Sequence, residues 1–210
     1  MSKIYGMPPV RVRHIDLTVD EMMFWLYCPV KIPYGALTTP STLKQFRPLM
    51  DEVRRDLADT DRWGESYVYI TAKRLWVTPD SPGNRPGWHS DGFMTEDVNY
   101  VWSDCNGTVF WEPDALVSLT QDHLVSMQEM ETLAKRGPLV TYPDKMLLRL
   151  DERVIHRVAD FDKACMRTFV KISVSTHQYR LKGNSINHKL KLNWTYLDRQ
   201  EERNAPEVTK

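Results

Sequence analysis

Apolar residues alternate with polar ones along much of the chain after residue 66, and this period of two is typical of β-strands. The runs are rich in aromatic and β-branched residues, which favour strands. They predict strands at 67–72, 75–78, 99–102, 108–111, 146–150, 154–158 and 166–175, and a terminal strand at 189–196. In the run 166–175, one face carries four residues that we expect to look into the mouth of the fold: Arg167, Phe169, Lys171 and Ser173.

Apolar positions spaced three and four residues apart predict two helices elsewhere in the chain. The first covers residues 41–57, and Pro48 is expected to separate a first turn or two from its main part. The second covers residues 120–136, with Thr120 as the expected cap and cations in the last turn. Both helices have one apolar face, so we expect them to pack on a sheet.

The first 40 residues contain five prolines, which prevent long regular elements. They predict an N-terminal wrap with one short helix at 20–26, introduced by a capping pattern at Thr18 and Glu21.

The order of these elements favours an α+β, mainly β fold. We expect a double-stranded β-helix, that is, a jelly-roll or cupin-like barrel, with helices packed on one side. The chain shows no internal repeat, so we expect one domain over 1–210. Within it, 1–66 form the N-terminal wrap and helices, 67–176 the barrel core with a metal site, and 177–210 a C-terminal extension.

Composition excludes several classes of protein. The chain is 41% hydrophobic and 27% charged, which is ordinary for a soluble globular domain. It has 28 basic and 28 acidic residues, so we expect no strong binding of duplex nucleic acid. No apolar run approaches the roughly 20 residues of a membrane helix, and the first residues lack the apolar core of a secretory signal. We therefore expect a cytoplasmic protein without a membrane partner.

The three cysteines support the same interpretation. Cys28, Cys105 and Cys165 are odd in number and widely spaced, which fits neither a disulfide framework nor a Cys-x-x-Cys metal site. We interpret them as reduced structural thiols.

Two His-x-Asp triplets are the candidate chemistry. His14 and Asp16 lie in a short β-like run, and their plainest interpretation is a surface strand. His89 and Asp91 follow a turn-rich segment at 79–87, a context that suits a site. Residues two apart on a strand point to the same face, so His89 and Asp91 can reach one metal ion.

A distant histidine completes the second triplet. If a later strand brings His156 to His89 and Asp91, two imidazoles and one carboxylate form a facial triad with open positions. Non-haem Fe(II) oxygenases use this ligand set to bind a co-substrate and then dioxygen. We therefore predict that these three residues are the metal ligands and the catalytic centre.

Arg167 lies eleven residues after His156. The pattern between them, a short strand, a polar turn and a long strand, predicts a hairpin that places Arg167 on the strand next to His156. A guanidinium there can hold a carboxylate with two parallel hydrogen bonds. The alternative for an arginine taken alone is an ordinary surface cation.

With these residues, the sequence resembles the Fe(II)/2-oxoglutarate-dependent oxygenase superfamily, and is closest to small members of the kind that phages carry. The superfamily shares a His-x-Asp/Glu motif, a distal His and an Arg or Lys about ten residues later, which His89, Asp91, His156 and Arg167 match. The resemblance covers about residues 67–176. It implies Fe(II) as cofactor, 2-oxoglutarate and dioxygen as co-substrates, and succinate and CO2 as products. Because Asp91 is present, it implies hydroxylation or demethylation rather than halogenation.

One position departs from the pattern of the superfamily. Many relatives have Arg-x-Ser at the clamp, whereas Phe169 stands two residues after Arg167. The second contact to 2-oxoglutarate is then expected from Tyr100 or Arg74, and the sequence does not choose between them.

The substrate pocket is less well marked. Candidate lining residues are Trp88, Trp102, Phe169 and Lys171, although a core position is the favoured interpretation for the tryptophans. A small molecule, a nucleobase and a protein side chain all stay open as substrates, because substrate-selecting loops carry no readable code.

Two other classes of protein compete with the oxygenase. One is a cupin-like metal-binding or sensor protein that uses the same ligands without redox turnover. The other is an interaction domain in which His89 and Asp91 only form hydrogen bonds in a polar cleft.

Overall fold

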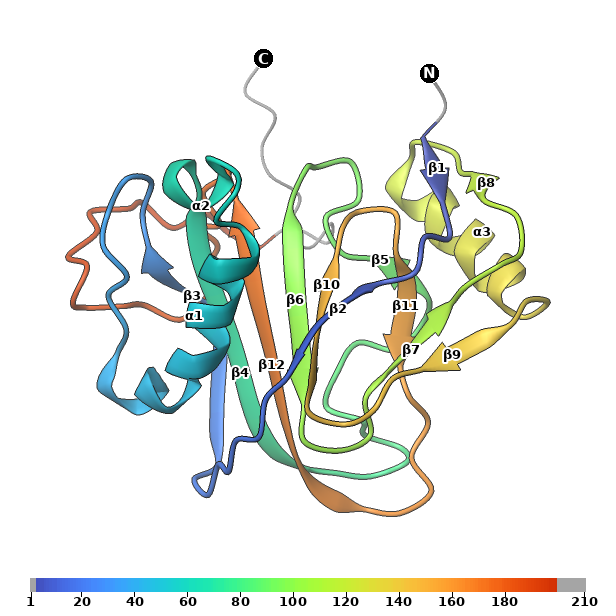
Figure 1. Ribbon diagram of the computed structural model, residues 1–210, viewed down its shortest axis with the longest axis horizontal. Coiled ribbons are helices and arrows are strands. Elements are labelled where there is room, and N and C mark those ends of the chain that lie inside the picture. The colour runs from blue at the N-terminus through green and yellow to red at the C-terminus, as the bar shows by residue number, and fades with distance from the viewer. Residues whose placement is uncertain (1–2, 200–210) are drawn as a thin grey trace.

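The computed structural model describes residues 3–199, which form a mainly β, α+β fold with antiparallel sheets and few helices (Figure 1). The larger sheet has six strands in the order β2 (Val10–His14), β10 (Met146–Leu150), β6 (Val98–Ser103), β12 (Cys165–Ser175), β4 (Tyr67–Val77) and β3 (Met23–Lys31). A second sheet has the order β5 (His89–Ser90), β11 (Ile155–Val158), β7 (Thr108–Trp111) and β9 (Leu139–Thr141). The expected α+β, mainly β class is confirmed, and the two sheets are compatible with a β-sandwich.

Four helical segments and a small third sheet complete the described chain. The helical segments are η1 (Ser41–Phe46), α1 (Arg47–Asp56), α2 (Arg62–Glu65) and α3 (His123–Ala134). Strand β1 (Ile4–Tyr5) pairs with β8 (Val117–Ser118). No helix among residues 3–199 is long and apolar enough to cross a membrane.

The centre of the larger sheet is built from β4 and β12, which pair in register along their whole length, from Cys165 opposite Val77 to Ser175 opposite Tyr67. Their outward face is apolar, because Ile70 and Ile172 alternate with inward polar neighbours and are fully buried. This alternation is the one that the sequence predicts for residues 166–175.

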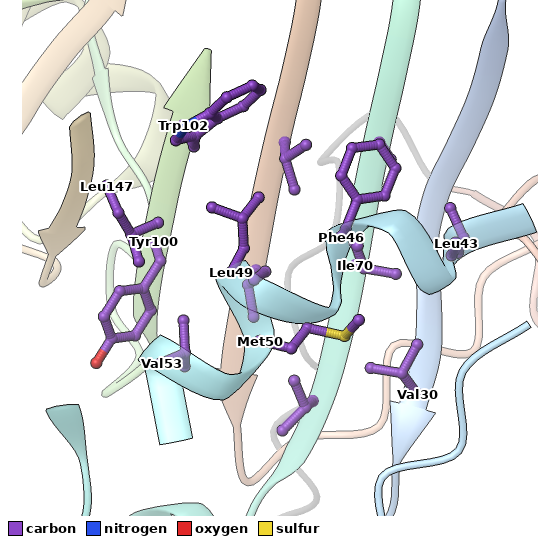
Figure 2. Close-up of a cluster of buried hydrophobic side chains, with 14 of the residues drawn as sticks. Val30, Leu43, Phe46, Leu49, Met50, Val53, Ile70, Tyr100, Trp102 and Leu147 are labelled. Carbon is purple, nitrogen blue, oxygen red and sulfur yellow. The ribbon is translucent and has the colours of Figure 1, made fainter. Parts of the chain in front are cut away.

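Helix α1 covers that outward face. Figure 2 shows the apolar side of η1 and α1 lying on the sheet, with Leu49, Met50 and Val53 directed at the strands. Each of these side chains is fully buried, which stabilises the fold by roughly 1.5–3 kcal/mol per residue. Pro48 lies in the first turn of α1, where its missing N–H costs no hydrogen bond. The predicted break between a first turn and the main helix is therefore confirmed.

Three sequence predictions about elements are wrong. The short helix at 20–26 is absent, because Met23 begins strand β3 and pairs with Arg74 of β4; tertiary pairing outweighs the local capping pattern. The terminal strand at 189–196 is also absent, and only an isolated bridge joins Leu181 to Leu197 in this part of the described chain. The cap of α3 is Asp122, not Thr120.

The start of α3 has a plain physical reason. The Asp122 carboxylate accepts hydrogen bonds from the backbone N–H groups of Leu124 and Val125, as an N-cap residue does. Thr120 bonds instead to the side chain of Glu129.

Candidate metal centre

The two histidines of the predicted triad are direct cross-strand partners. His89 in β5 lies opposite His156 in β11, and their ring centroids are 4.6 Å apart. Asp91 follows β5 immediately, and its Oδ2 atom lies 3.6 Å from Nε2 of His156. One ligand atom from each of the three residues lies within 4.8 Å of the others. The expected ligands therefore come together, as in a metal site.

Backbone carbonyls fix the orientation of both imidazoles. Nδ1 of His89 lies 2.9 Å from the carbonyl oxygen of Gly87, and Nδ1 of His156 lies 3.1 Å from that of Val154. A carbonyl can only accept, so each Nδ1 carries the proton and each Nε2 keeps a lone pair for a metal. Burial, with the neighbouring His156, lowers the pKa of His89 to about 4, so this ring is neutral at pH 7.

Asp91 is held in a tight turn. Gly92 has a φ of +78°, and its carbonyl oxygen accepts hydrogen bonds from both the backbone N–H and the hydroxyl of Thr95. A Cβ atom at Gly92 would lie 3.1 Å from Cβ of Asp97. Glycine is therefore required here both by its backbone angle and by its neighbours.

Lys171 is the closest cation to the cluster. Its Nζ atom lies 3.1 Å from each carboxylate oxygen of Asp91 and 3.0 Å from the hydroxyl of Tyr27. Burial alone would raise the pKa of Asp91, but Lys171 outweighs burial and holds it well below its usual range. Asp91 is therefore an anion at neutral pH, as a metal ligand must be.

The cluster opens onto a cavity of about 650 Å³ between the two sheets. Its apolar wall is formed by Phe24, Leu26, Phe93, Met94, Val101, Val158 and Phe169. Five cations line it, Lys73, Arg85, Arg157, Lys171 and Arg199, against two carboxylates, Asp91 and Asp97. This excess of positive charge suits an anionic ligand.

Arg167 is close to this cavity but is not part of its lining. It is 2% exposed, and its Nε atom donates to the carbonyl oxygens of Cys105 and Asn106. Its Nη2 atom is buried without a hydrogen-bond partner. The guanidinium carbon lies 5.1 Å from the centroid of the Phe169 ring, and Phe169 itself faces the cavity.

The predicted hairpin between His156 and Arg167 is wrong. His156 lies in β11 of the smaller sheet, whereas Arg167 lies in β12 of the larger one. The turn between the strands therefore crosses from one layer to the other.

Several other candidates lie away from the cavity. Tyr100 is directed at α1 (Figure 2), and its hydroxyl donates to Asp56. Arg74 bonds to Asp104 and Thr168. Both point away from the cavity, to the opposite side of the sheet from Phe169 and Lys171, so neither fits the second contact to a ligand bound there. Both lie on the outward face of the sheet, because their positions alternate with the inward ones.

The candidate pocket residues divide in the same way. Phe169 and Lys171 line the cavity. Trp102 belongs to the outward core and donates to the carbonyl oxygens of Ile15 and Lys145. Trp88 packs in the core beneath α3. The core interpretation therefore holds for both tryptophans.

The other His-x-Asp triplet is not part of a metal-ligand cluster within the described residues. His14 is exposed at the end of β2, and Asp16 forms an ion pair with Lys145. The surface-strand interpretation fits this triplet.

Lys73 and Tyr27 are among the cavity residues that sequence reasoning missed. The strand 67–77 is continuous, but its prediction as two runs left Lys73 in the gap between them. Continuing the alternation from Tyr69 through Thr71 would have placed Lys73 on the inward face. No comparable signal marks Tyr27, because β3 itself was not predicted.

Comparison with protein-family models, with curated proteins and with solved structures found no match to this chain.

Proposed function

We propose that this protein is an Fe(II)- and 2-oxoglutarate-dependent dioxygenase that hydroxylates an organic substrate and releases succinate and CO2. The observation that carries the proposal is the His89–Asp91–His156 cluster at the wall of a cation-rich cavity. We also propose that the two facing sheets form a double-stranded β-helix. The antiparallel pairing within each sheet supports that topology.

The donor set suits Fe(II). Two neutral imidazole nitrogens and one carboxylate oxygen are the ligands of the 2-His-1-carboxylate triad, which leaves positions open for other ligands. The ligands come from two adjacent strands and the turn that follows one of them. They therefore approach from one side and leave the cavity side open.

The charges around the cluster favour a dianionic co-substrate. A divalent ion bound by one carboxylate keeps one positive charge, and Lys171, Lys73 and Arg167 lie on the facing strands. Burying several like charges is costly unless a ligand neutralises them. A dicarboxylate such as 2-oxoglutarate supplies two negative charges, and we assign its distal carboxylate to Arg167, whose Nη2 atom has no partner.

In this proposal, the residues of the chain bind and orient the iron and the co-substrate. Bound iron would supply the activation of dioxygen, with one oxygen atom passing to the succinate and the other to the substrate while C1 of 2-oxoglutarate leaves as CO2. Lys171 keeps Asp91 ionised and fixes the plane of its carboxylate. The apolar wall, including Phe93 and Val158, limits access of water to the reacting centre.

The presence of Asp91 favours hydroxylation over halogenation. Its carboxylate takes the position that a halide would need, so we propose hydroxylation, or the demethylation that follows from hydroxylating a methyl group.

The proposal is tested with metal-free protein reconstituted anaerobically with Fe(II) and then given 2-oxoglutarate and air. We expect slow formation of succinate, abolished in the His89→Ala/Asp91→Ala variant together with iron binding. The matched control is His14→Ala/Asp16→Ala, which should retain both. Stoichiometric iron binding without any succinate would instead favour the metal-binding or sensor protein.

A further inference from the structure

Lys73 is a half-buried cation that faces the cavity and has no acidic partner. Its Nζ atom donates to the carbonyl oxygen of Gly83 at 3.0 Å and to Oδ1 of Asn84 at 3.4 Å. No carboxylate of residues 3–199 lies within 4.0 Å of it. Burial, with Lys171 and Arg167 nearby, lowers the pKa of Lys73 to about 8. The folded protein therefore keeps an ammonium whose charge is not neutralised by the chain itself.

The register of the sheet places Lys73 between two other cations. It pairs with Phe169 of β12, while Arg167 and Lys171 lie two residues to either side of Phe169 on the same face. Diagonal neighbours across an antiparallel pair have Cα atoms about 7–8 Å apart, within reach of long side chains. Lys73 can therefore approach a ligand that contacts either of the other two.

The length of the co-substrate favours Lys73 as a contact. Lys171 and Arg167 are four residues apart, roughly 14 Å along the strand, and Lys171 touches the metal ligand Asp91. A five-carbon diacid whose keto acid end lies at the metal reaches the level of Lys73 before it reaches that of Arg167. Arg167 also lies behind Phe169 and outside the cavity lining, whereas Lys73 is part of it.

Phe169 stands at the position where many members of the superfamily have a serine, which could donate a hydrogen bond to the co-substrate. A side chain at this position faces the cavity, but a phenyl ring cannot donate a hydrogen bond to a carboxylate. A donor from the neighbouring strand is then needed, and Lys73 is the residue opposite.

We infer that the ammonium of Lys73 binds the distal carboxylate of the dicarboxylate co-substrate, as the second contact beside Arg167. This inference rests on the proposed function and adds to it the residue that selects a diacid over a monoacid. Asn84 and the carbonyl of Gly83 act as positioning groups that hold the ammonium in the wall.

The experiment compares two keto acids in the anaerobic Fe(II) protein, monitored by the metal-to-ligand charge-transfer band and by calorimetry. The acids are 2-oxoglutarate and 2-oxopentanoate, which has the same five carbons without the distal carboxylate. In Lys73→Met, 2-oxoglutarate should bind about 10- to 100-fold more weakly, while 2-oxopentanoate binds as it does to the wild type. Lys73→Arg should recover part of the loss.

A matched control and the contrary outcomes complete the design. Lys163→Met changes the same residue type at an exposed position of the β11–β12 turn and should leave both affinities unchanged. Equal preference for the diacid in Lys73→Met and the wild type would overturn the role of Lys73 while leaving the proposed function intact. Failure of the iron-loaded wild type to bind 2-oxoglutarate would overturn both. A melting curve for each variant establishes that it is folded. If Lys73→Met does not fold, the affinities of Lys73→Arg for the two keto acids are compared with those of the wild type instead.

Discussion

Nζ of Lys171 lies 3.1 Å from both carboxylate oxygens of Asp91, so the residue that we propose as the anionic iron ligand is already paired with a cation. The pair comes from different sheets, since Asp91 follows β5 and Lys171 lies in β12. A metal needs only one carboxylate oxygen. The second can stay with Lys171, which then fixes the orientation of the ligand.

This relationship gives a prediction for Lys171→Met. Without the ammonium, the Asp91 carboxylate loses the group that orients it, and its pKa rises because burial is no longer opposed by Lys171. Fe(II) should bind about 10- to 100-fold more weakly, as when an outer-shell partner of a ligand is removed. A competition assay with a chromophoric chelator measures this. Lys171→Arg, which keeps the charge, should lose less; equal iron affinity in Lys171→Met and the wild type would show that Asp91 is oriented by other groups.

The sequence predicts the His89–Asp91–His156 cluster from a local motif, His89 and Asp91, and from one distant histidine, His156. His89 and Asp91 are two residues apart, so any strand or tight turn keeps them together. His156 has no such constraint, and its prediction as a ligand depended on a later strand returning to the site. The pairing of β5 with β11, which brings it to His89, is a long-range contact between short strands that no periodicity encodes.

Some strands of the fold could be predicted from the sequence and others could not. Strand β12 was predictable because one face packs in the apolar core with α1 and the other faces the cavity, which makes its alternation strong. Strand β3 was not predictable. It lies at the edge of the sheet, carries Pro29 and shifts its register twice against β4, so its pattern of apolar residues is irregular.

Arg167→Ala should affect both stability and co-substrate binding. The variant leaves the carbonyl oxygens of Cys105 and Asn106 without their donor and opens a cavity beside Phe169. We expect a loss of about 2–4 kcal/mol in the free energy of unfolding, and a roughly thirtyfold or greater loss of 2-oxoglutarate affinity. Urea denaturation and titration of the charge-transfer band measure the two effects. Retained 2-oxoglutarate affinity in a folded Arg167→Ala protein would limit this arginine to a structural role.

Lys73→Met should have the opposite effect on the stability of the ligand-free protein. The pKa of Lys73 in the folded state, about 8, lies below the ordinary value of 10.5, so burial of the charged form destabilises the fold at pH 7. The shift corresponds to on the order of 3 kcal/mol before the loss of two hydrogen bonds is subtracted. We expect the variant to unfold at a higher urea concentration than the wild type at pH 7.

The same pKa sets the pH dependence of this difference. Between about pH 8 and 10.5 the unfolded chain holds the Lys73 proton that the folded protein has lost, so the stability of the wild type rises relative to that of Lys73→Met. Below pH 8 both states are protonated and the difference is constant. Lys171 and Arg167 of β12 are the charged neighbours that lower this pKa in addition to burial, and Arg85, in the loop that holds the ammonium, lines the same cavity. A stability difference that does not change between pH 8 and 10.5 would mean that Lys73 titrates as an exposed lysine does.

The turn that carries Asp91 gives the last prediction. Gly92→Ala adds a Cβ atom 3.1 Å from Cβ of Asp97 and from the hydroxyl of Thr95, at a φ of +78°. The backbone strain alone costs roughly 1–2 kcal/mol, and the contact with Asp97 should displace the turn, so that Asp91 no longer meets His89 and His156. Iron affinity should fall at least tenfold, measured by chelator competition.

Gly183→Ala is the matched control for this variant. Gly183 has a φ of +89°, but a Cβ atom there would meet only a guanidinium nitrogen of Arg199 at 3.9 Å. The control therefore carries the same type of backbone strain without crowding and lies outside the cavity lining. It should lose a similar amount of stability and keep its iron affinity. If both variants bind iron as the wild type does, the crowding at Gly92 is relieved without moving Asp91, and the turn is not what positions this ligand.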